Sequence, residues 1–322
     1  MRAPNDGSAV REPTGAFDIE EKFVVALASS ALFDLTESDR VFRERGEEEY
    51  RLYQREHEED VLNPGVAFPF VRRLLSLNGA DPGDRPVEVI LLSRNDPDTG
   101  LRVFNSIAHY KLAISRGAFV TGRRPYRYMP AFNASLFLSA NEEDVRAALR
   151  DGRPAGQVLG ESLDDDPSDP ELRIAFDFDG VLASDEAERV NQERGLQQFL
   201  DHESANAPLP LEPGPLKHLL EEMSRLQRLE RRRVERDSNY VPKIRTAIVT
   251  SRNAPAHRRL VTTLRSWGIT VDETLLLGGL EKNRVLEVFR PHMFFDDQRT
   301  HAVPAAAVAP SVHVPFGIGN LS

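Results

Sequence analysis

Residues 172–181 read Leu-Arg-Ile-Ala-Phe-Asp-Phe-Asp-Gly-Val, and this stretch decides the fold class of the chain. Its apolar first half predicts a short buried strand of a parallel sheet that ends in two aspartates. Because residues i and i+2 of a strand share a face, Asp177 and Asp179 are expected to address one small site at the carboxyl edge of the sheet. One carboxylate can attack a phosphoryl group and form an aspartyl-phosphate, while the other transfers protons. The alternative is a strand that simply ends in an Asp-Gly turn.

Three later segments carry groups suited to phosphate or metal binding, each close behind a strand-like run. Thr250 and Ser251 offer hydroxyls, with backbone N–H groups leading into a helix, and this combination suits a phosphate. Lys282 can neutralise a phosphate beside carboxylates. Asp296 and Asp297 add oxygen ligands of the kind that Mg²⁺ requires. Each has an ordinary explanation alone, as a helix cap, a solvated lysine or a turn, but their order along the chain favours a catalytic site.

Further segments resemble a known family. Together with the acid-bearing motifs, they resemble the haloacid dehalogenase (HAD) superfamily of phosphotransferases and, within it, the cytosolic 5′-nucleotidases of class I. The likeness extends from about Phe23 to Gly317. Animal members read D-G-D-A-V where this chain has D-F-D-G-V, a departure that keeps the acids but bears on the preferred base or sugar. The segments that carry the resemblance are 175–188 (A-F-D-F-D-G-V-L-A-S-D-E-A-E), 264–268 (L-R-S-W-G), 290–292 (R-P-H), 294–298 (F-F-D-D-Q), 67–71 (A-F-P-F-V) and 105–107 (N-S-I).

The resemblance implies a Mg²⁺-dependent hydrolysis of nucleoside 5′-monophosphates such as AMP or IMP. Asp177 would attack phosphorus, and Asp179 would protonate the leaving oxygen and later activate water. Mg²⁺ would be held by Asp177, the backbone carbonyl of Asp179 and Asp296. The phosphoryl oxygens would be bound by Thr250, Ser251 and Lys282, with Asp297 orienting the lysine or a water on the metal.

Substrate specificity is less constrained by the sequence. Phe178 and Asp185 are candidate nucleoside contacts, Asp185 because it lies in the family-like S-D-E segment. His202, Asn206 and Trp267 are weaker candidates, which helix surface or core packing explains equally well. Two other functions stay open: a HAD phosphatase acting on a sugar phosphate or on a nucleotide of a specialised pathway, and a non-enzymatic nucleotide sensor. The retained acids disfavour the sensor.

Composition limits the class of protein. The 322 residues carry a net charge of −10 with a pI near 5.4, which argues against a nucleic-acid partner. There is no cysteine, so disulfides and thiolate chemistry are excluded. No apolar run is long enough to span a membrane, and the first residues lack the apolar core of a signal peptide. We therefore expect a cytoplasmic protein that contacts no membrane. A nucleotide effector, implied by the activation of animal members by ADP, and a homo-oligomer are left open.

The first half of the chain echoes the second. A shift of 149 residues places Ala26 on Ala175 and Pro64-Gly65 on Pro213-Gly214, and shifts of 158 and 157 align later segments. These shifts predict duplication of one α/β unit, although chance matches between similar patterns are the alternative. The catalytic positions then fall on uncharged residues, so the first copy is expected to be catalytically silent. In this alignment Asp177, Asp179, Thr250, Lys282 and Asp296-Asp297 fall on Ala28, Ser30, Leu92, Pro125 and Ser139-Ala140.

The predicted fold class is α/β, with two tandem doubly wound parallel-sheet units of the HAD or Rossmann-like kind. We expect a flexible N-terminus over 1–20, a degenerate non-catalytic domain over 21–160 and an acidic exposed linker over 161–170. The catalytic domain is expected over 171–322. A small helical cap, inserted at about 186–213 directly after the nucleophile strand, is the best candidate for contacting the rest of the substrate.

Overall fold

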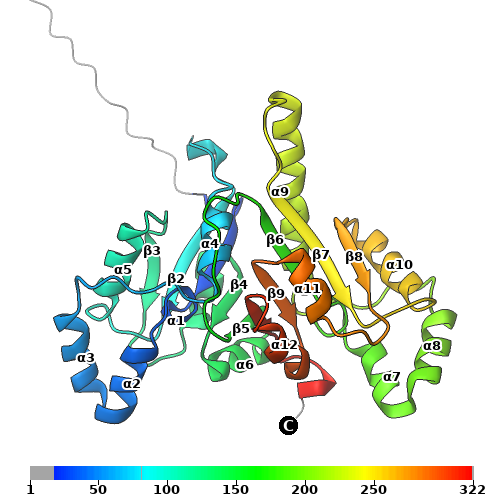
Figure 1. The fold of residues 1–322 in the computed structure, drawn as a ribbon, viewed down its shortest axis with the longest axis horizontal. Helices are drawn as coiled ribbons and strands as arrows, with labels where there is room; N and C mark the ends of the chain where they lie inside the picture. The colour runs from blue at the N-terminus through cyan, green and yellow to red at the C-terminus, as the bar shows by residue number, and fades with distance from the viewer. Residues whose placement is uncertain (1–17, 81, 321–322) are drawn as a thin grey trace, which may run out of the picture.

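In the computed structural model, which describes residues 18–80 and 82–320, the strands form one continuous sheet (Figure 1). The strand order is β3-β2-β1-β4-β5-β10-β9-β6-β7-β8, and every pair is parallel except β5 with β10. The expected mixed α/β class with a mainly parallel sheet is confirmed. The strands are β1 (Phe23–Leu27), β2 (Val87–Ser93), β3 (Arg116–Phe119), β4 (Ala134–Ser139), β5 (Ala155–Leu159), β6 (Leu172–Phe176), β7 (Ile244–Thr250), β8 (Glu273–Leu276), β9 (Met293–Asp296) and β10 (Ser311–His313).

The two halves of the sheet repeat one strand order. The first half runs β3-β2-β1-β4-β5 and the second runs β8-β7-β6-β9-β10 when both are read toward the junction. The halves meet through strand pairing, because β5 and β10 lie antiparallel with Gln157 opposite His313. The sheet is therefore continuous across the junction. The description as two tandem HAD units that arose by duplication stays a prediction.

Strand register corrects one of the predicted shifts. Phe23 of β1 lies opposite Val87 of β2, and Leu172 of β6 lies opposite Ile244 of β7. If β1 is aligned with β6 at the shift of 149, this register aligns β2 with β7 and places Ser93 on Thr250. The shift between β2 and β7 is therefore 157, and the predicted 158 is wrong by one residue. The polar end of β2 therefore corresponds to the polar end of β7.

Helices cover both faces of the sheet and form two further pairs at its carboxyl edge. Figure 1 shows the pair α2 and α3 and the pair α7 and α8 at the two lower corners. Within the segment 186–213, where a helical cap is expected, the helix is broken at Gly195, which has φ +81° and separates α7 from α8. The helices are α1 (Ser29–Leu32), α2 (Thr36–Arg45), α3 (Glu47–Glu56), α4 (Phe68–Leu75), α5 (Gly100–His109), α6 (Glu142–Arg150), α7 (Glu186–Arg194), α8 (Leu196–Ala205), α9 (Lys217–Arg236), α10 (His257–Trp267), α11 (Asn283–Phe289) and α12 (Arg299–Ala305).

One hydrophobic core joins the two halves. A single cluster of buried side chains includes Val25 and Leu136 from the first half and Ile174 and Phe295 from the second. The strands β1, β2, β7 and β9 are almost entirely buried because a parallel sheet covered on both faces offers no solvent side. The core therefore fixes the ends of β6, β7 and β9 relative to one another, and these ends carry the predicted site.

The acidic segment 161–170 is tied to the body of the protein. Its Asp165 lies 2.6 Å from the guanidinium of Arg72 and 2.8 Å from that of Arg73, whose side chain is buried. Seven of the segment's ten residues are exposed, as expected for a linker, whereas Asp165 is half-buried by these ion pairs. Most of the flexible segment predicted over 1–20 lies outside the described residues. Within the described part of the chain, no helix combines the length and apolar character needed to cross a membrane.

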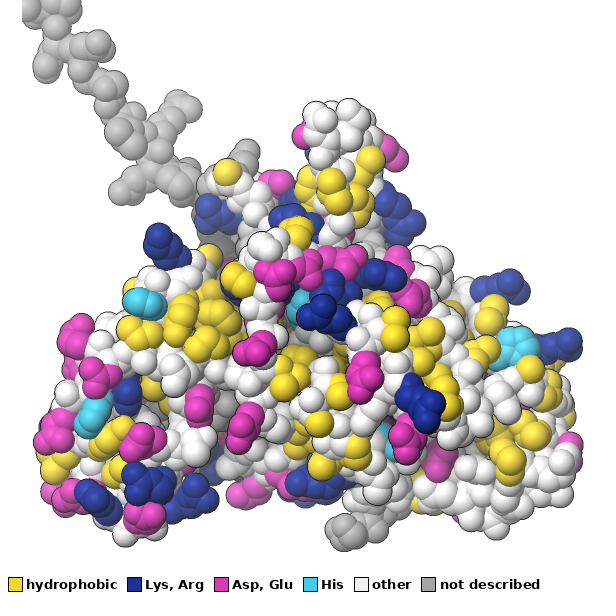
Figure 2. All heavy atoms as spheres, in the orientation of Figure 1, with side chains coloured by type: hydrophobic (Ala, Val, Ile, Leu, Met, Phe, Trp, Pro, Cys, Tyr) yellow, Lys and Arg dark blue, Asp and Glu magenta, His cyan; other side chains and the backbone are white. Residues whose placement is uncertain are grey.

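The surface carries mixed charge. Figure 2 shows acidic and basic side chains interspersed over one face of the molecule. Many of them form ion pairs one helical turn apart, such as Arg51 with Glu47 and Arg146 with Glu142. Exposed pairs of this kind stabilise a fold only slightly. The buried charges, which are far fewer, lie mostly at the carboxyl edge of the second half.

Candidate active site

The predicted site residues converge at the carboxyl ends of three neighbouring strands. Asp177 follows β6 directly, Thr250 is the last residue of β7, and Asp296 is the last residue of β9. Strand β6 pairs with β7 on one side and β9 on the other, so the three ends lie side by side. Lys282 reaches the same point from the residue before α11. This is the sheet edge at which α/β folds bind ligands.

Lys282 is the centre of the site. Its Nζ lies 2.7 Å from Asp177 Oδ2 and 2.6 Å from Asp296 Oδ2, and all three side chains are buried. Burial works against the charged lysine, but the two carboxylates more than compensate and raise its pKa. Burial also raises the pKa of Asp177, to about 7, although Lys282 opposes this change. Asp296 differs, because Lys282 and His301 outweigh the effect of burial and lower its pKa. The lysine thus holds two buried carboxylates together.

Asp297 is the third buried acid of the site. Its Oδ1 is buried and accepts no hydrogen bond among the described residues. Burial and the neighbouring Asp177 and Asp296 raise its pKa to about 9. The side chain also touches the turn after β6, since a Cβ added at Gly180 would lie 2.4 Å from Asp297 Oδ2. Glycine at position 180, with φ +73°, therefore leaves room for this carboxylate.

Asp179 faces away from this cluster toward an arginine that the sequence analysis missed. Arg252 binds it through two hydrogen bonds, from Nε to Oδ2 and from a terminal nitrogen to Oδ1, both 2.7 Å long. The guanidinium also donates to Glu203 of α8. Arg252 and Glu203 are 3 % and 0 % exposed, so this is a buried charge network. The sequence feature that could have identified it is the position of Arg252 directly after Thr250 and Ser251.

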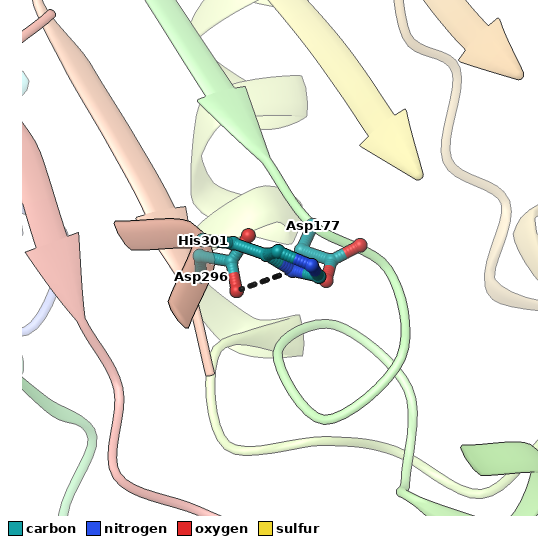
Figure 3. A group of neighbouring side chains, drawn as sticks. All are labelled: Asp177, Asp296 and His301. Carbon is teal, nitrogen blue, oxygen red and sulfur yellow. Dashed lines mark ion pairs between the residues drawn. The ribbon is translucent and has the colours of Figure 1, made fainter. Parts of the chain in front are cut away.

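A second missed residue belongs to a candidate metal centre. His301 of α12 has its Nδ1 3.7 Å from Asp296 Oδ1, and Figure 3 shows its ring beside Asp296 and Asp177. Asp177, Asp296 and His301 each offer one ligand atom, and these atoms lie within 4.8 Å of one another. An excess of buried acid, including the unpartnered Asp297 oxygen, calls for positive charge beyond Lys282. These donors fit a divalent cation. The expected carboxylate ligands Asp177 and Asp296 are thus together, while the carboxylate of Asp179 is bound to Arg252.

The predicted phosphate-binding residues border the same site. Thr250 is 1 % exposed, and its Oγ1 accepts a hydrogen bond of 3.2 Å from the backbone N–H of Arg252. Ser251 is exposed and lines a cavity of about 290 Å³ together with Lys282 and His301. This cavity gives a small anionic group access to the lysine and the serine. The structure brings Ser251 and Lys282 to one cavity, whereas the Thr250 hydroxyl stabilises the turn beneath them.

The weaker substrate candidates have structural contacts. Phe178 is fully buried, with the Arg252 guanidinium 5.3 Å from its ring centroid. Asp185 is 8 % exposed and accepts a hydrogen bond of 2.7 Å from the backbone N–H of Ile318. His202 lies 3.1 Å from Glu186, and Trp267 packs against the hydrophobic core. A role for Phe178 or Asp185 in binding substrate stays a prediction.

At the corresponding edge of the first half, uncharged residues stand at the positions aligned with the acids of the second half. A cavity of about 260 Å³ there is lined by Ala28, Ser30, Ser93 and Ala140, among others. Arg94 also lines it, but two hydrogen bonds of 2.7 and 2.6 Å join this arginine to Asp144. Its charge is therefore already compensated. The silent role of this half stays a prediction, consistent with the absence of a carboxylate at positions 28, 30, 139 and 140.

Comparison with known proteins adds an independent line of support. Residues 16–321 match the protein family described as 5′-nucleotidase. Among curated proteins, the chain is similar to the human protein named cytosolic 5′-nucleotidase 1B, with 36 % identity over 283 residues. The alignment covers 86 % of this chain and 46 % of the human protein, so the chain spans about half the length of that relative. No solved structure matches.

Proposed function

Because this chain belongs to the 5′-nucleotidase family, we propose that it is a Mg²⁺-dependent phosphoric monoester hydrolase that converts nucleoside 5′-monophosphates, of the AMP or IMP kind, to nucleoside and phosphate. The observation that carries the proposal is the buried lysine bridge: Lys282 lies between Asp177 and Asp296 where three parallel strands end. A nucleophilic carboxylate, a fixed cation and further acids at one sheet edge are the groups that phosphoryl transfer through a covalent intermediate requires.

In the first step, a carboxylate oxygen of Asp177 forms a bond to phosphorus as the bond from phosphorus to the 5′-oxygen breaks. For this step Asp179 carries a proton on one oxygen, which gives up its hydrogen bond from Arg252. It transfers that proton to the leaving oxygen, so a neutral nucleoside leaves and an aspartyl-phosphate remains. Lys282 holds Asp177 in place through a contact of 2.7 Å and offsets the repulsion between carboxylate and phosphate. Ser251 and the backbone N–H groups of the turn after β7 contact the phosphoryl oxygens.

In the second step, Asp179, now ionised, takes a proton from water as the water oxygen bonds to phosphorus. The bond between phosphorus and the Asp177 oxygen breaks, and inorganic phosphate leaves with both aspartates restored. This exchange of roles requires that the Asp179 carboxyl can reach both the leaving oxygen and the water. It lies on the same turn as the nucleophile, two residues further along, and only 17 % of its side chain is exposed.

A divalent cation would be held by Asp177 and Asp296, with His301 and Asp297 at hand as further donors. When bound, it supplies positive charge that polarises the phosphoryl group and offsets the excess of carboxylates. Magnesium is the ion we propose, because two or three carboxylates at a phosphate site suit it. The name of the human relative supports a cytosolic location. The nucleotide effector and the homo-oligomer stay predictions.

A panel of phosphate esters tests the proposal. Purified protein is incubated with Mg²⁺ and with nucleoside 5′-monophosphates, nucleoside 3′-monophosphates or sugar phosphates, and the release of inorganic phosphate is measured. The proposal predicts that one or more 5′-monophosphates give the highest kcat/KM. A sugar phosphate as the best substrate would keep the chemistry and replace the substrate class. Nucleotide binding without phosphate release from any ester would favour the sensor.

A further inference from the structure

The helical insert, defined here as α7 and α8 (Glu186–Ala205), is connected to the acid of the active site by buried charges. Arg252 lies between Asp179, which it holds through two bonds, and Glu203 of α8. On its other side Glu203 accepts a hydrogen bond of 2.9 Å from Arg259, which also lies 3.1 Å from Glu186 of α7. The chain of contacts thus runs from the active site through two arginines into both helices of the insert.

The insert also encloses the arginine. The Arg252 guanidinium lies 5.7 Å from the ring centroid of Phe199 on α8 and 5.3 Å from that of Phe178. Its remaining hydrogen bond, 3.2 Å long, goes to the carbonyl of Ala256. With two carboxylates, a carbonyl and two rings around it, Arg252 has little freedom to turn. Its place is therefore set by α8 as much as by the loop that carries it.

Buried ion pairs contribute little net stability to a fold, because desolvation offsets most of the Coulomb attraction. They do fix geometry, since a guanidinium that donates two parallel hydrogen bonds holds a carboxylate in one orientation. Here the carboxylate so held is the one that must reach the leaving oxygen. An error of about 1 Å in such a group can lower the rate by about 100-fold.

We propose that Arg252 and Glu203 are positioning residues: Arg252 orients the Asp179 carboxyl toward the leaving oxygen, and Glu203 of the helical insert anchors Arg252. The inference rests on the proposed function, in which Asp179 protonates that oxygen. Neither residue touches the phosphorus in this scheme. Loss of either one should therefore weaken proton donation and leave attack by Asp177 largely intact.

Two kinds of phosphate ester distinguish a loss of proton donation from a loss of attack by Asp177. An alkyl phosphate, such as a nucleoside 5′-monophosphate, releases a poor leaving group that needs a proton, whereas p-nitrophenyl phosphate releases a stable anion that does not. The value of kcat/KM reports the first transfer, before water enters. In Arg252→Lys, which keeps the charge and loses the paired geometry, we expect kcat/KM to fall about 10-fold to 100-fold for the alkyl ester and less than about 3-fold for the aryl ester.

Glu203→Gln should show the same selective fall, of about 10-fold, because the arginine loses its charged anchor while the side chain keeps its size. Glu230→Gln is the matched control: Glu230 is a buried acid in α9 that accepts hydrogen bonds from Tyr240 and from the backbone N–H of Lys243 and Ile244, away from the site. Its replacement should lower thermal stability without changing the ratio of the two kcat/KM values. Circular dichroism verifies that each variant is folded.

Equal losses on both esters in Arg252→Lys and Glu203→Gln would overturn the inference, because they would indicate phosphate binding or general damage. Unchanged kcat/KM on the alkyl ester would overturn it as well. If the protein hydrolyses another alkyl phosphate but no nucleotide, the proposed substrate class is wrong. The ratio of kcat/KM for that alkyl ester to kcat/KM for the aryl ester then tests the positioning role. If wild-type protein hydrolyses neither kind of ester, the proposed function and the positioning role fall together.

Discussion

Gly180→Ala should abolish most activity at a small loss of stability, and the structure gives the magnitude of both effects. An alanine Cβ would lie 2.4 Å from Asp297 Oδ2 and 2.6 Å from its Cγ, whereas ordinary contact begins at 3.4 Å. The Asp297 carboxyl must therefore move by about 1 Å, a displacement that can lower a rate by about 100-fold in a preorganised site. The φ of +73° adds a backbone cost of about 1–2 kcal/mol for any residue with a Cβ.

Gly268→Ala is the matched control for the backbone cost. Gly268 ends α10 with φ +65°, and a Cβ there meets nothing within 4 Å. An unfolding entropy of about 2.1 cal/mol/K per residue corresponds to about 0.7 kcal/mol/K for 322 residues, so a loss of 1–2 kcal/mol lowers Tm by about 2–3 °C. Both variants should show this decrease by calorimetry, and only Gly180→Ala should lose kcat. The account of Asp297 would be refuted if Gly180→Ala kept activity within about 3-fold of wild type, or if Gly268→Ala lost as much.

Three further substitutions address individual acids and the lysine. Asp177→Asn should retain less than about one hundredth of wild-type kcat in a phosphate-release assay, because an amide is a poor nucleophile and a poor metal ligand. Lys282→Met leaves Asp177 and Asp296 without their cation, which should cost about 3–5 kcal/mol of stability and lower Tm in chelator by about 4–7 °C. Excess Mg²⁺ should restore part of the lost Tm. An unchanged Tm in chelator would contradict the buried bridge. The raised pKa values of Asp177 (about 7) and Asp297 (about 9) mean that the metal-free folded protein binds protons more tightly than the unfolded chain. Its stability should therefore decline as pH rises from the ordinary aspartate value of 3.8 through these raised values. Asp297→Asn should flatten that decline in urea titrations at several pH values, and a slope equal to that of wild type would show that Asp297 does not contribute.

The central part of the site could be predicted from sequence because it follows from one rule of α/β folds. Apolar runs that end in Asp177, Thr250 and Asp296 predict parallel strands, and such strands bring their carboxyl ends to one edge. The pairing of β6 with β7 and β9 does so here. Lys282 could be included because it follows another strand and a Gly-Gly turn, although only the structure shows that it bridges Asp177 and Asp296.

The groups that were missed depend on contacts that no local pattern encodes. Arg252 donates a hydrogen bond to Glu203, which lies 49 residues earlier in a helix of the insert, so the sequence near either residue does not indicate the pair. His301 lies on α12, a short helix with Pro304 inside it that residue patterns did not predict. The predicted alignment of β2 with β7 was wrong by one residue for a related reason. Strands buried on both faces show no alternation of apolar and polar residues that would fix their alignment.

The measurement that tests the account most directly is the identity of the phosphorylated residue. Wild-type protein and Asp179→Asn are mixed with a hydrolysed 5′-monophosphate and Mg²⁺, quenched in acid within the turnover time, digested and mapped by mass spectrometry. The account predicts one phosphoryl group on the peptide that contains Asp177, accumulating in Asp179→Asn if transfer still proceeds, and none when Mg²⁺ is removed by chelator. Phosphate on a different residue, or hydrolysis that continues at the wild-type rate in Asp177→Asn, would contradict it.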